Sequence, residues 1–196
     1  MAAVASPYGL RPVNMVGGRP NTGGAMREVP MTVNSSTGIF TGDVVIIGAS
    51  SAGQPTAATA TVSTSTGGVL GVCVGVRYVD PTLKYSVNAS YLPANAITNG
   101  YTNVYIFVND DPDQLYMVQG AGSIAATTRG YQAALGNFGG STTTGLSTIN
   151  LVAPARTATL AMRVVDFIDA GSNYTDVIVK FNTGVLMYDS TTITAA

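Results

Sequence analysis

The residues of this sequence that could do chemistry are few, and its only acidic cluster is Asp110-Asp111-Pro112-Asp113. Carboxylate oxygens are ligands for Ca²⁺, but the cluster lacks the spaced oxygen ligands and the terminal Glu of a calcium-binding loop. Pro112 fixes its own φ angle and has no N–H, which suits a turn. We therefore predict a turn that joins one strand to its return strand, and no metal site.

A glycine-rich segment, residues 136–145, is the second candidate, because glycine-rich loops can hold a phosphate group. A phosphate-binding loop needs a helix directly after it and a Lys nearby. Here the following residues, 146–151, have the pattern of a strand, and no Lys lies near them in the sequence. We interpret the segment as a flexible surface loop.

The residue types that are missing exclude most catalytic and metal sites. The chain has no His, so it can form neither a Ser-His-Asp nor a Cys-His arrangement. Its single Cys, Cys73, cannot form an intrachain disulfide, and its neighbours Val72 and Val74 indicate a buried thiol. We expect no catalytic residue, no cofactor and no metal, and hence no enzyme. An enzyme that uses only Asp side chains is the alternative left open.

The charge of the chain is low and balanced, with 9 basic and 10 acidic residues and a formal net charge of −1. Because no run of Lys or Arg is present, we expect no nucleic-acid partner. The apolar runs are far shorter than the roughly 20 residues of a membrane-spanning helix, so we expect no membrane partner. The first residues lack the basic region and apolar stretch of a secretory signal, which predicts synthesis in the cytoplasm.

The elements that must position these residues are predicted to be strands, because apolar and polar residues alternate along the chain. Turn-forming residues separate the alternating segments at the spacing of an all-β barrel or sandwich. We therefore expect an all-β fold, a small antiparallel barrel or sandwich, over residues 31–196, with two sub-lobes that divide near residues 85–100. The expected strands are 28–33, 44–47, 59–64, 69–79, 101–108, 114–119, 157–168 and 175–181.

Some positions within these elements carry more specific expectations. Gly71 and Gly75 lie inside the long strand 69–79, which indicates a bulge or a close approach of two backbones. At most one short helix is expected, and the weak candidates for it are residues 93–98 and 123–135. Val74 and Val179 are expected in the core, where an Asp in their place would unfold the body.

Residues 1–30 form an extended N-terminal arm in this interpretation, because Pro and Gly recur along them. Pro denies a helix its N–H, and Gly breaks regular pairing. The alternative is a solvated tail, which has little reason to keep apolar residues. We expect the arm to contact another chain, where acidic groups pair with Arg11 and Arg19. The candidate contact residues are Tyr8, Leu10, Arg11, Pro12, Val13, Met15 and Arg19.

Several short motifs give the chain a resemblance to a known family. They are Ser6-Pro-Tyr-Gly-Leu-Arg-Pro-Val13 with Gly17-Gly18, Gly42-Asp-Val, Gly68-Val-Leu-Gly-Val72, Val108-Asn-Asp-Asp-Pro-Asp113 and Thr142-Thr-Thr-Gly-Leu-Ser147. Together they resemble the capsid decoration (cement) proteins of tailed bacteriophages over most of the chain. The resemblance implies a β-rich body, often a small barrel or β-tulip, an arm on the capsid lattice, and no catalytic residues. It implies the major capsid protein as partner and the outer surface of the capsid in the virion as location.

We further expect self-association, with a homotrimer favoured over a dimer, because low surface charge reduces repulsion between copies. Two alternatives stay open for the function. One is another virion component, such as a tail, fibre or head-completion protein, which would share this composition. The other is a carbohydrate-binding β-sandwich of the adhesion type. A glycan partner would need exposed aromatic rings, and the chain has no Trp but ten Tyr.

Overall fold

The computed structural model describes residues 4–20, 26–47, 54–58, 68–156 and 160–188 of the chain, and in these residues the fold is all-β. The strands form two larger antiparallel sheets and two short two-stranded pairs. Neither larger sheet closes on itself, so the fold is an arrangement of open sheets, as in a sandwich, and not a barrel. The expected all-β class is confirmed.

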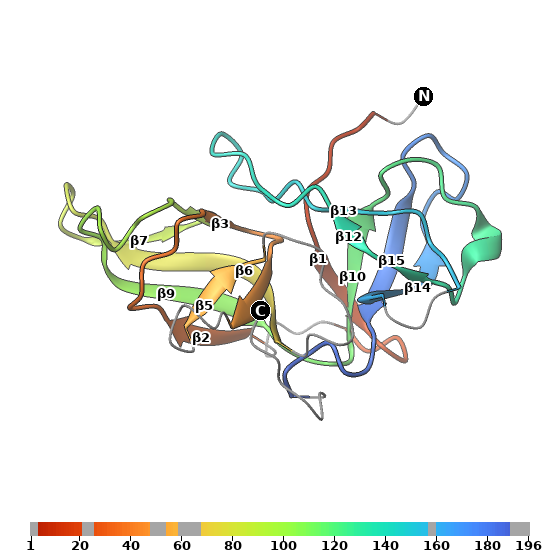
Figure 1. Cartoon of the computed structure of the whole chain (residues 1–196), viewed down its shortest axis with the longest axis horizontal. Coiled ribbons are helices and arrows are strands. Elements are labelled where there is room, and N and C mark those ends of the chain that lie inside the picture. Colours follow the sequence, from red (N-terminus) through yellow and green to blue (C-terminus); the bar gives the residue numbers. More distant parts are fainter. Residues whose placement is uncertain (1–3, 21–25, 48–53, 59–67, 157–159, 189–196) are drawn as a thin grey trace.

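Sheet A has the strand order β1-β10-β15-β14-β11. The short pair β12–β13 and one 3₁₀ turn, η2, belong to the same half of the molecule (Figure 1). The bounds are β1 (Arg11–Met15), β10 (Gln114–Gln119), η2 (Ala126–Thr128), β11 (Gln132–Ala133), β12 (Leu135–Gly136), β13 (Asn150–Leu151), β14 (Met162–Phe167) and β15 (Asp176–Phe181).

Sheet B has the strand order β2-β9-β6-β4-β5, with β7 paired to the second half of β6. The short pair β3–β8 lies in the same half of the molecule (Figure 1). The bounds are β2 (Met26–Pro30), β3 (Ile39–Phe40), β4 (Val44–Ile47), β5 (Pro55–Ala57), β6 (Val69–Val79), β7 (Ser86–Ala89), β8 (Tyr91–Leu92) and β9 (Thr102–Asn109).

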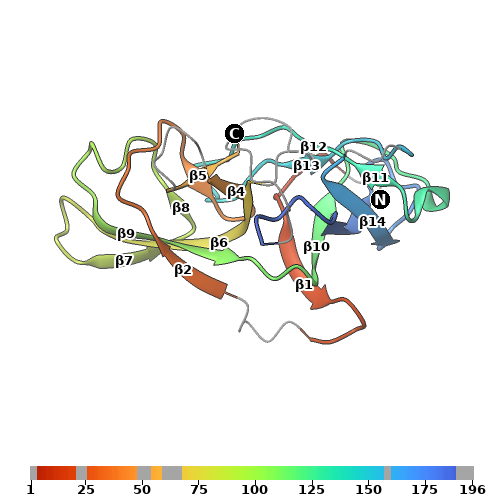
Figure 2. The ribbon, with the colours of Figure 1, turned by 60° about the horizontal axis from the view of Figure 1, so that its bottom comes forward.

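The two sheets lie side by side along the long axis of the molecule. Strands β6 and β9 run along this axis in both ribbon views, whereas β1 and β10 run across it (Figures 1 and 2). Two hydrophobic clusters follow this division. One is centred on sheet A and also takes in Val44, Val69 and Val72 from sheet B; the other lies within the sheet B half and includes the fully buried Cys73. The three valines of sheet B that belong to the first cluster therefore join the two halves. The expected burial of Cys73 is confirmed.

Local patterning predicted several strands well. Strands β4, β6 and β10 have the predicted bounds, and β2, β9, β13, β14 and β15 lie within or overlap theirs. The other described strands, β1, β3, β5, β7, β8, β11 and β12, were not predicted. A Cβ atom on Gly71 would collide with the carbonyl oxygen of Asn109, and the register between β6 and β9 shifts between Cys73 and Gly75. The expected close approach and bulge are therefore both present. The only helical element in the described residues is η2, and the expected strand 59–64 lies outside them.

The partner of β10 differs from the prediction. Residues 110–113 do form the expected turn, but β10 does not return along β9. It instead crosses into sheet A, where it lies between β1 and β15. The chain therefore changes sheets at residues 110–113, outside the range 85–100 expected for a division into sub-lobes.

The first thirty residues also differ from the expected free arm. Their described part supplies an edge strand to each sheet, β1 to sheet A and β2 to sheet B. The physical reason is the apolar series within the segment: Leu10 is only 1% exposed and belongs to the sheet A cluster. Burial of this side chain, together with backbone pairing to β10, holds the segment on its own chain.

Candidate functional site

The N-terminal residues predicted to contact another chain are bound to their own chain at Tyr8. The Tyr8 hydroxyl donates a hydrogen bond of 2.7 Å to Oδ1 of Asp176, the first residue of β15. The guanidinium carbon of Arg11 lies 4.2 Å from the centre of the Tyr8 ring. Burial and the bond to Asp176 raise the pKa of Tyr8 well above its usual value, so the phenol stays neutral. Tyr8 therefore holds the segment on sheet A.

Leu10 is a core residue and does not present a contact surface. Its N–H donates to the carbonyl oxygen of Gly42 at 3.0 Å. Gly9 before it has φ +74°, and a Cβ there would lie 2.7 Å from the same oxygen. This close passage of two backbone segments requires glycine at position 9. The prediction of Leu10 as a contact residue is corrected accordingly.

The irregular middle of β1 is held by a buried side chain that sequence reasoning missed. The register with β10 shifts between Pro12 and Met15. The Gln114 side-chain amide, 1% exposed as a residue, donates to the carbonyl oxygens of Val13 at 3.4 Å and Asn14 at 3.2 Å. The amide of Asn109 donates in turn to Gln114 Oε1 at 3.2 Å. Gln at a strand end gives no local signal for this role, because its partners lie far away in the sequence.

What remains available for a partner is the outer side of β1. Among the described residues β1 pairs only with β10, so its other edge has no strand beside it. Arg11, Val16 and Arg19 are exposed, while Pro12, Val13 and Met15 are half-buried. We call residues 11–16 together with Arg19 the β1 edge. The β1 edge contains five of the seven predicted contact residues. The other two, Tyr8 and Leu10, lie beside it.

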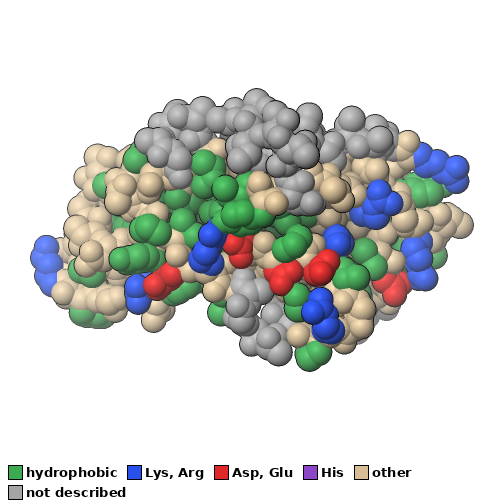
Figure 3. Space-filling model, turned by 90° about the horizontal axis from the view of Figure 1, so that it is seen from below, with side chains coloured by type: hydrophobic (Ala, Val, Ile, Leu, Met, Phe, Trp, Pro, Cys, Tyr) green, Lys and Arg blue, Asp and Glu red, His purple; other side chains and the backbone are tan. Residues whose placement is uncertain are grey.

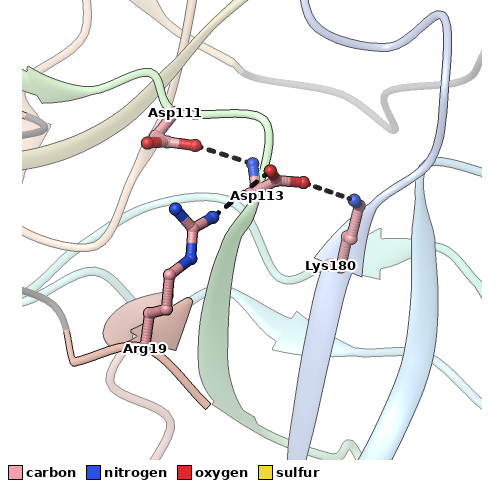
Figure 4. Close-up of polar contacts among 4 residues, drawn as sticks. All are labelled: Arg19, Asp111, Asp113 and Lys180. Atoms are coloured by element: carbon pink, nitrogen blue, oxygen red, sulfur yellow. Dashed lines mark hydrogen bonds and ion pairs between the residues drawn. The ribbon is translucent and has the colours of Figure 1, made fainter. Parts of the chain in front are cut away.

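The acidic cluster is a neutralised turn. Asp113 lies between Arg19, at 3.6 Å, and Lys180, at 3.3 Å, and its N–H donates to Oδ1 of Asp111 at 2.7 Å (Figure 4). Arg27 pairs with Asp110 at 2.9 Å. Seen from below, acidic groups lie beside basic ones near the middle of this face (Figure 3). Arg19 thus already has an acidic partner within its own chain, and in the described residues no three Asp, Glu or Cys groups are placed to hold a metal.

The glycine-rich segment 136–145 lies at the surface but is tied to both halves of the molecule. Thr41 donates its N–H to the carbonyl oxygen of Gly145 at 3.2 Å and accepts the N–H of Ser147 at 2.9 Å. A Cβ on Gly140 would collide with the ring of Phe40. These contacts correct the expectation of a flexible loop, because residues 140–147 pack against Phe40 at the end of β3 and bond to Thr41 beside it. The next strand, β13, confirms that no helix follows.

A second exposed surface is the face of sheet B that points away from its core. Tyr105 and Phe107 alternate along β9 with the buried Val104, Ile106 and Val108, so both rings lie on the opposite face. The rings are partly exposed, and the guanidinium carbon of Arg77 lies 4.8 Å from the centre of the Tyr105 ring. The same guanidinium pairs with Glu28 at 2.8 Å. An open depression of about 320 Å³ adjoins Phe107, where Gly75 has no side chain.

One buried acid is left without full compensation. Asp43, 3% exposed, accepts the N–H of Phe40 on Oδ2 at 2.8 Å, whereas its Oδ1 has no hydrogen-bond partner. The Ser147 hydroxyl and the Phe40 N–H both lower the pKa of Asp43, and the hydroxyl oxygen also lies 3.3 Å from the carbonyl oxygen of Gly139. Burial dominates and raises the pKa of Asp43 to about 6. Sequence reasoning missed this residue, because Gly42-Asp43 has the pattern of an ordinary turn.

Comparison with known proteins finds no match to a family model, to a curated protein or to a solved structure. None of the helical residues described forms a segment long and apolar enough to cross a membrane.

Proposed function

We propose that this protein is a structural component of a tailed-phage virion that binds the outer surface of the assembled capsid and cements neighbouring major capsid subunits. In this proposal it has no catalytic role, is made in the host cytoplasm and acts in the virion. The motifs that resemble decoration proteins suggest the role, and the β1 edge supplies a means of attachment.

The observation that carries the proposal is the side of β1 that none of the described strands covers. An unpaired strand edge can accept a strand from another chain, and main-chain hydrogen bonds then provide affinity. Pro12, which lacks an N–H, and the bulge at residues 13–14 protect the edge from indiscriminate pairing. A partner strand must therefore fit this irregular outline, which suits a dedicated site on a capsid subunit.

This mode of attachment replaces the free arm that the sequence predicts. Because the segment is already ordered on sheet A, docking costs little further backbone entropy. The nearby charges are largely paired within the chain, as Arg19 is with Asp113. Binding is therefore expected to depend on backbone pairing and apolar contact more than on ion pairs, and to persist in high salt.

A pair of matched valine substitutions tests the proposal. Val16, at the β1 edge, and Val152, after β13, are both 40% exposed. Val16→Asp places a charge that must be desolvated in the interface and should weaken binding to undecorated capsids at least about tenfold. Val152→Asp is the control and should bind like the wild type in the same co-sedimentation assay. Full decoration by Val16→Asp would contradict the β1 edge as the contact.

The proposed self-association is a homotrimer, in keeping with the low net charge of −1. Light scattering of the free protein measures its mass directly. A trimer mass supports the proposal, and a monomer at all concentrations that also occupies isolated capsid positions would contradict it.

Carbohydrate binding is the second candidate, and the outer face of sheet B is the observation that favours it. Tyr105 and Phe107 offer partly exposed rings, and Arg77 and Glu28 beside them offer donors and acceptors. A glycan array tests this reading. Binding that Tyr105→Ala abolishes, while Val16→Asp leaves it intact, would favour adhesion over capsid cementing.

A further inference from the structure

A cavity of about 250 Å³ lies between the two halves of the molecule and plays no part in the proposed capsid role. Its walls are mostly apolar, with Ala57 and Ala58 at the end of β5 on one side and the Phe138 ring on another. Polar groups come from Thr37, from the backbone of Gly38 and Gly139, and from Asp43.

Asp43 is the only ionisable residue that lines this cavity. Its Oδ1 atom is buried and lacks a hydrogen-bond partner, while Oδ2 is held by the Phe40 N–H. A buried acceptor without a partner is costly, because the water it has lost is not replaced. Because Asp43 is one of the residues that line the cavity, a donor bound there lies next to this side chain.

The chemistry of the walls narrows the class of donor. Ca²⁺ takes six or more oxygen ligands, and a single carboxylate beside alanines and a phenyl ring does not supply them. A primary ammonium group needs fewer acceptors, and its alkyl chain can lie against apolar walls. A nearby aromatic ring such as Phe138 also favours a cation over a neutral group.

We propose that this cavity binds a primary ammonium group on a short alkyl chain, with Asp43 as its acceptor. The ammonium group donates to the Asp43 carboxylate, and the alkyl chain packs against Ala57, Ala58 and Phe138. The group belongs either to a free alkylamine or to a lysine side chain of another protein. This site is independent of the β1 edge, so its failure leaves the capsid proposal untouched.

Thermal unfolding of the full chain with added small molecules tests the site. With millimolar n-butylammonium chloride we expect the unfolding temperature to rise by about 2–4 °C. n-Butanol, which has the same chain without the charge, should leave it unchanged. A blocked lysine, N-acetyl-lysine methylamide, separates the two sources: stabilisation by both amines supports a lysine side chain, and stabilisation by n-butylammonium alone supports a free amine.

Two variants connect any such effect to this cavity. Asp43→Asn removes the charge and should abolish the rise caused by n-butylammonium, measured against the variant's own unfolding temperature. Ala58→Leu fills the space, keeps the carboxylate and should also abolish it, which covers the case that one variant fails to fold. An equal rise in the wild type and in a folded variant, or no rise with n-butylammonium in the wild type, would overturn the proposal; the cavity would then hold water only.

Discussion

Asp43 makes the stability of the fold depend on pH in an unusual direction. Its pKa rises from an ordinary 3.8 to about 6 because burial disfavours the charged form. A raised carboxyl pKa means that the folded chain binds the proton more tightly than the unfolded chain. The cost of the buried charge is therefore fully present above about pH 6 and disappears as the pH falls below about 4.

Asp43→Asn should consequently stabilise the protein at pH 7.5 by up to about 3 kcal/mol, and the gain should vanish near pH 4. The Asn oxygen can still accept the Phe40 N–H, and its amide can donate to the nearby Ser147 hydroxyl oxygen. Denaturant unfolding at both pH values measures the difference. Asp80→Asn, the same change at a partly exposed residue of a turn, serves as the control. A variant less stable than the wild type at pH 7.5 would contradict this account.

Substitution by Asp was expected to unfold the protein at both Val74 and Val179, but the two variants should differ in stability. Val179 is fully buried in sheet A, so Val179→Asp should unfold the protein by burying an unpaired charge. Val74 is only half-buried and borders the open depression beside Phe107, which corrects its assignment to the core. Val74→Asp should therefore leave a cooperative unfolding transition in circular dichroism. Loss of that transition in Val74→Asp as well would show that its side chain is buried in solution.

At the scale of elements, β1 contributes to stability through the residue that precedes it. Leu10→Ala should lower the free energy of unfolding by about 2–5 kcal/mol, because it leaves a cavity in the sheet A cluster. Val16→Ala, at an exposed position, should change it by less than about 0.5 kcal/mol. Urea unfolding compares the two.

Deletion of residues 2–24 removes both Leu10 and β1, and so does not leave an intact body. The truncated chain should lose much of its stability, in contrast to the independent arm that the sequence predicts. A truncated protein as stable as the full chain would show that the segment is detachable in solution.

Most of the longer strands were predictable, because alternation is a local property, whereas most two- and three-residue strands carry too short a pattern to be recognised. The apolar series of β6 and the mixed run of β10 determine where each begins and ends. Which strand each of them pairs with was harder to predict from the sequence. Whether β10 returns along β9 or crosses to another sheet depends on contacts distant in sequence, such as the Gln114 bonds to residues 13 and 14. β1 was missed as a strand because its Pro and the glycines around it suggest irregular structure.

The candidate sites were predictable only in part. Exposure of Arg11 and Arg19 follows from their charge, but the burial of Leu10 depends on the close passage of Gly9 along Gly42. The turn at residues 110–113 was predicted from its sequence. Its basic partners could not be predicted, because they come from segments distant in the sequence. Asp43 could not be singled out, because only the packing of β5 and the loop at Phe138 makes its surroundings a cavity.

For the whole molecule, cementing predicts a mechanical effect on the capsid. A protein whose complete site exists only on the assembled lattice stabilises that lattice by its own binding free energy. Capsids stripped of this protein should lose DNA at a lower temperature or after a milder osmotic shock, and adding it back should restore them. Because the proposed contact does not rely on ion pairs, rescue should succeed in low and in high salt. Stripped capsids that remain as robust as intact ones would favour a tail or adhesion role.

The pairing of β1 with β10 also bears on the order in which the chain can fold. Gln114 and its bonding partner Val13 are 101 positions apart, and all strands of sheet B lie between them in the sequence. During synthesis the N-terminal strand emerges first but must wait for β10, so sheet B can assemble while β1 is still unpaired. Contacts of such long sequence separation slow folding. The growing chain thus exposes on the ribosome the strand that later forms an edge of the finished protein, and this interval is when unwanted association between nascent chains is most probable.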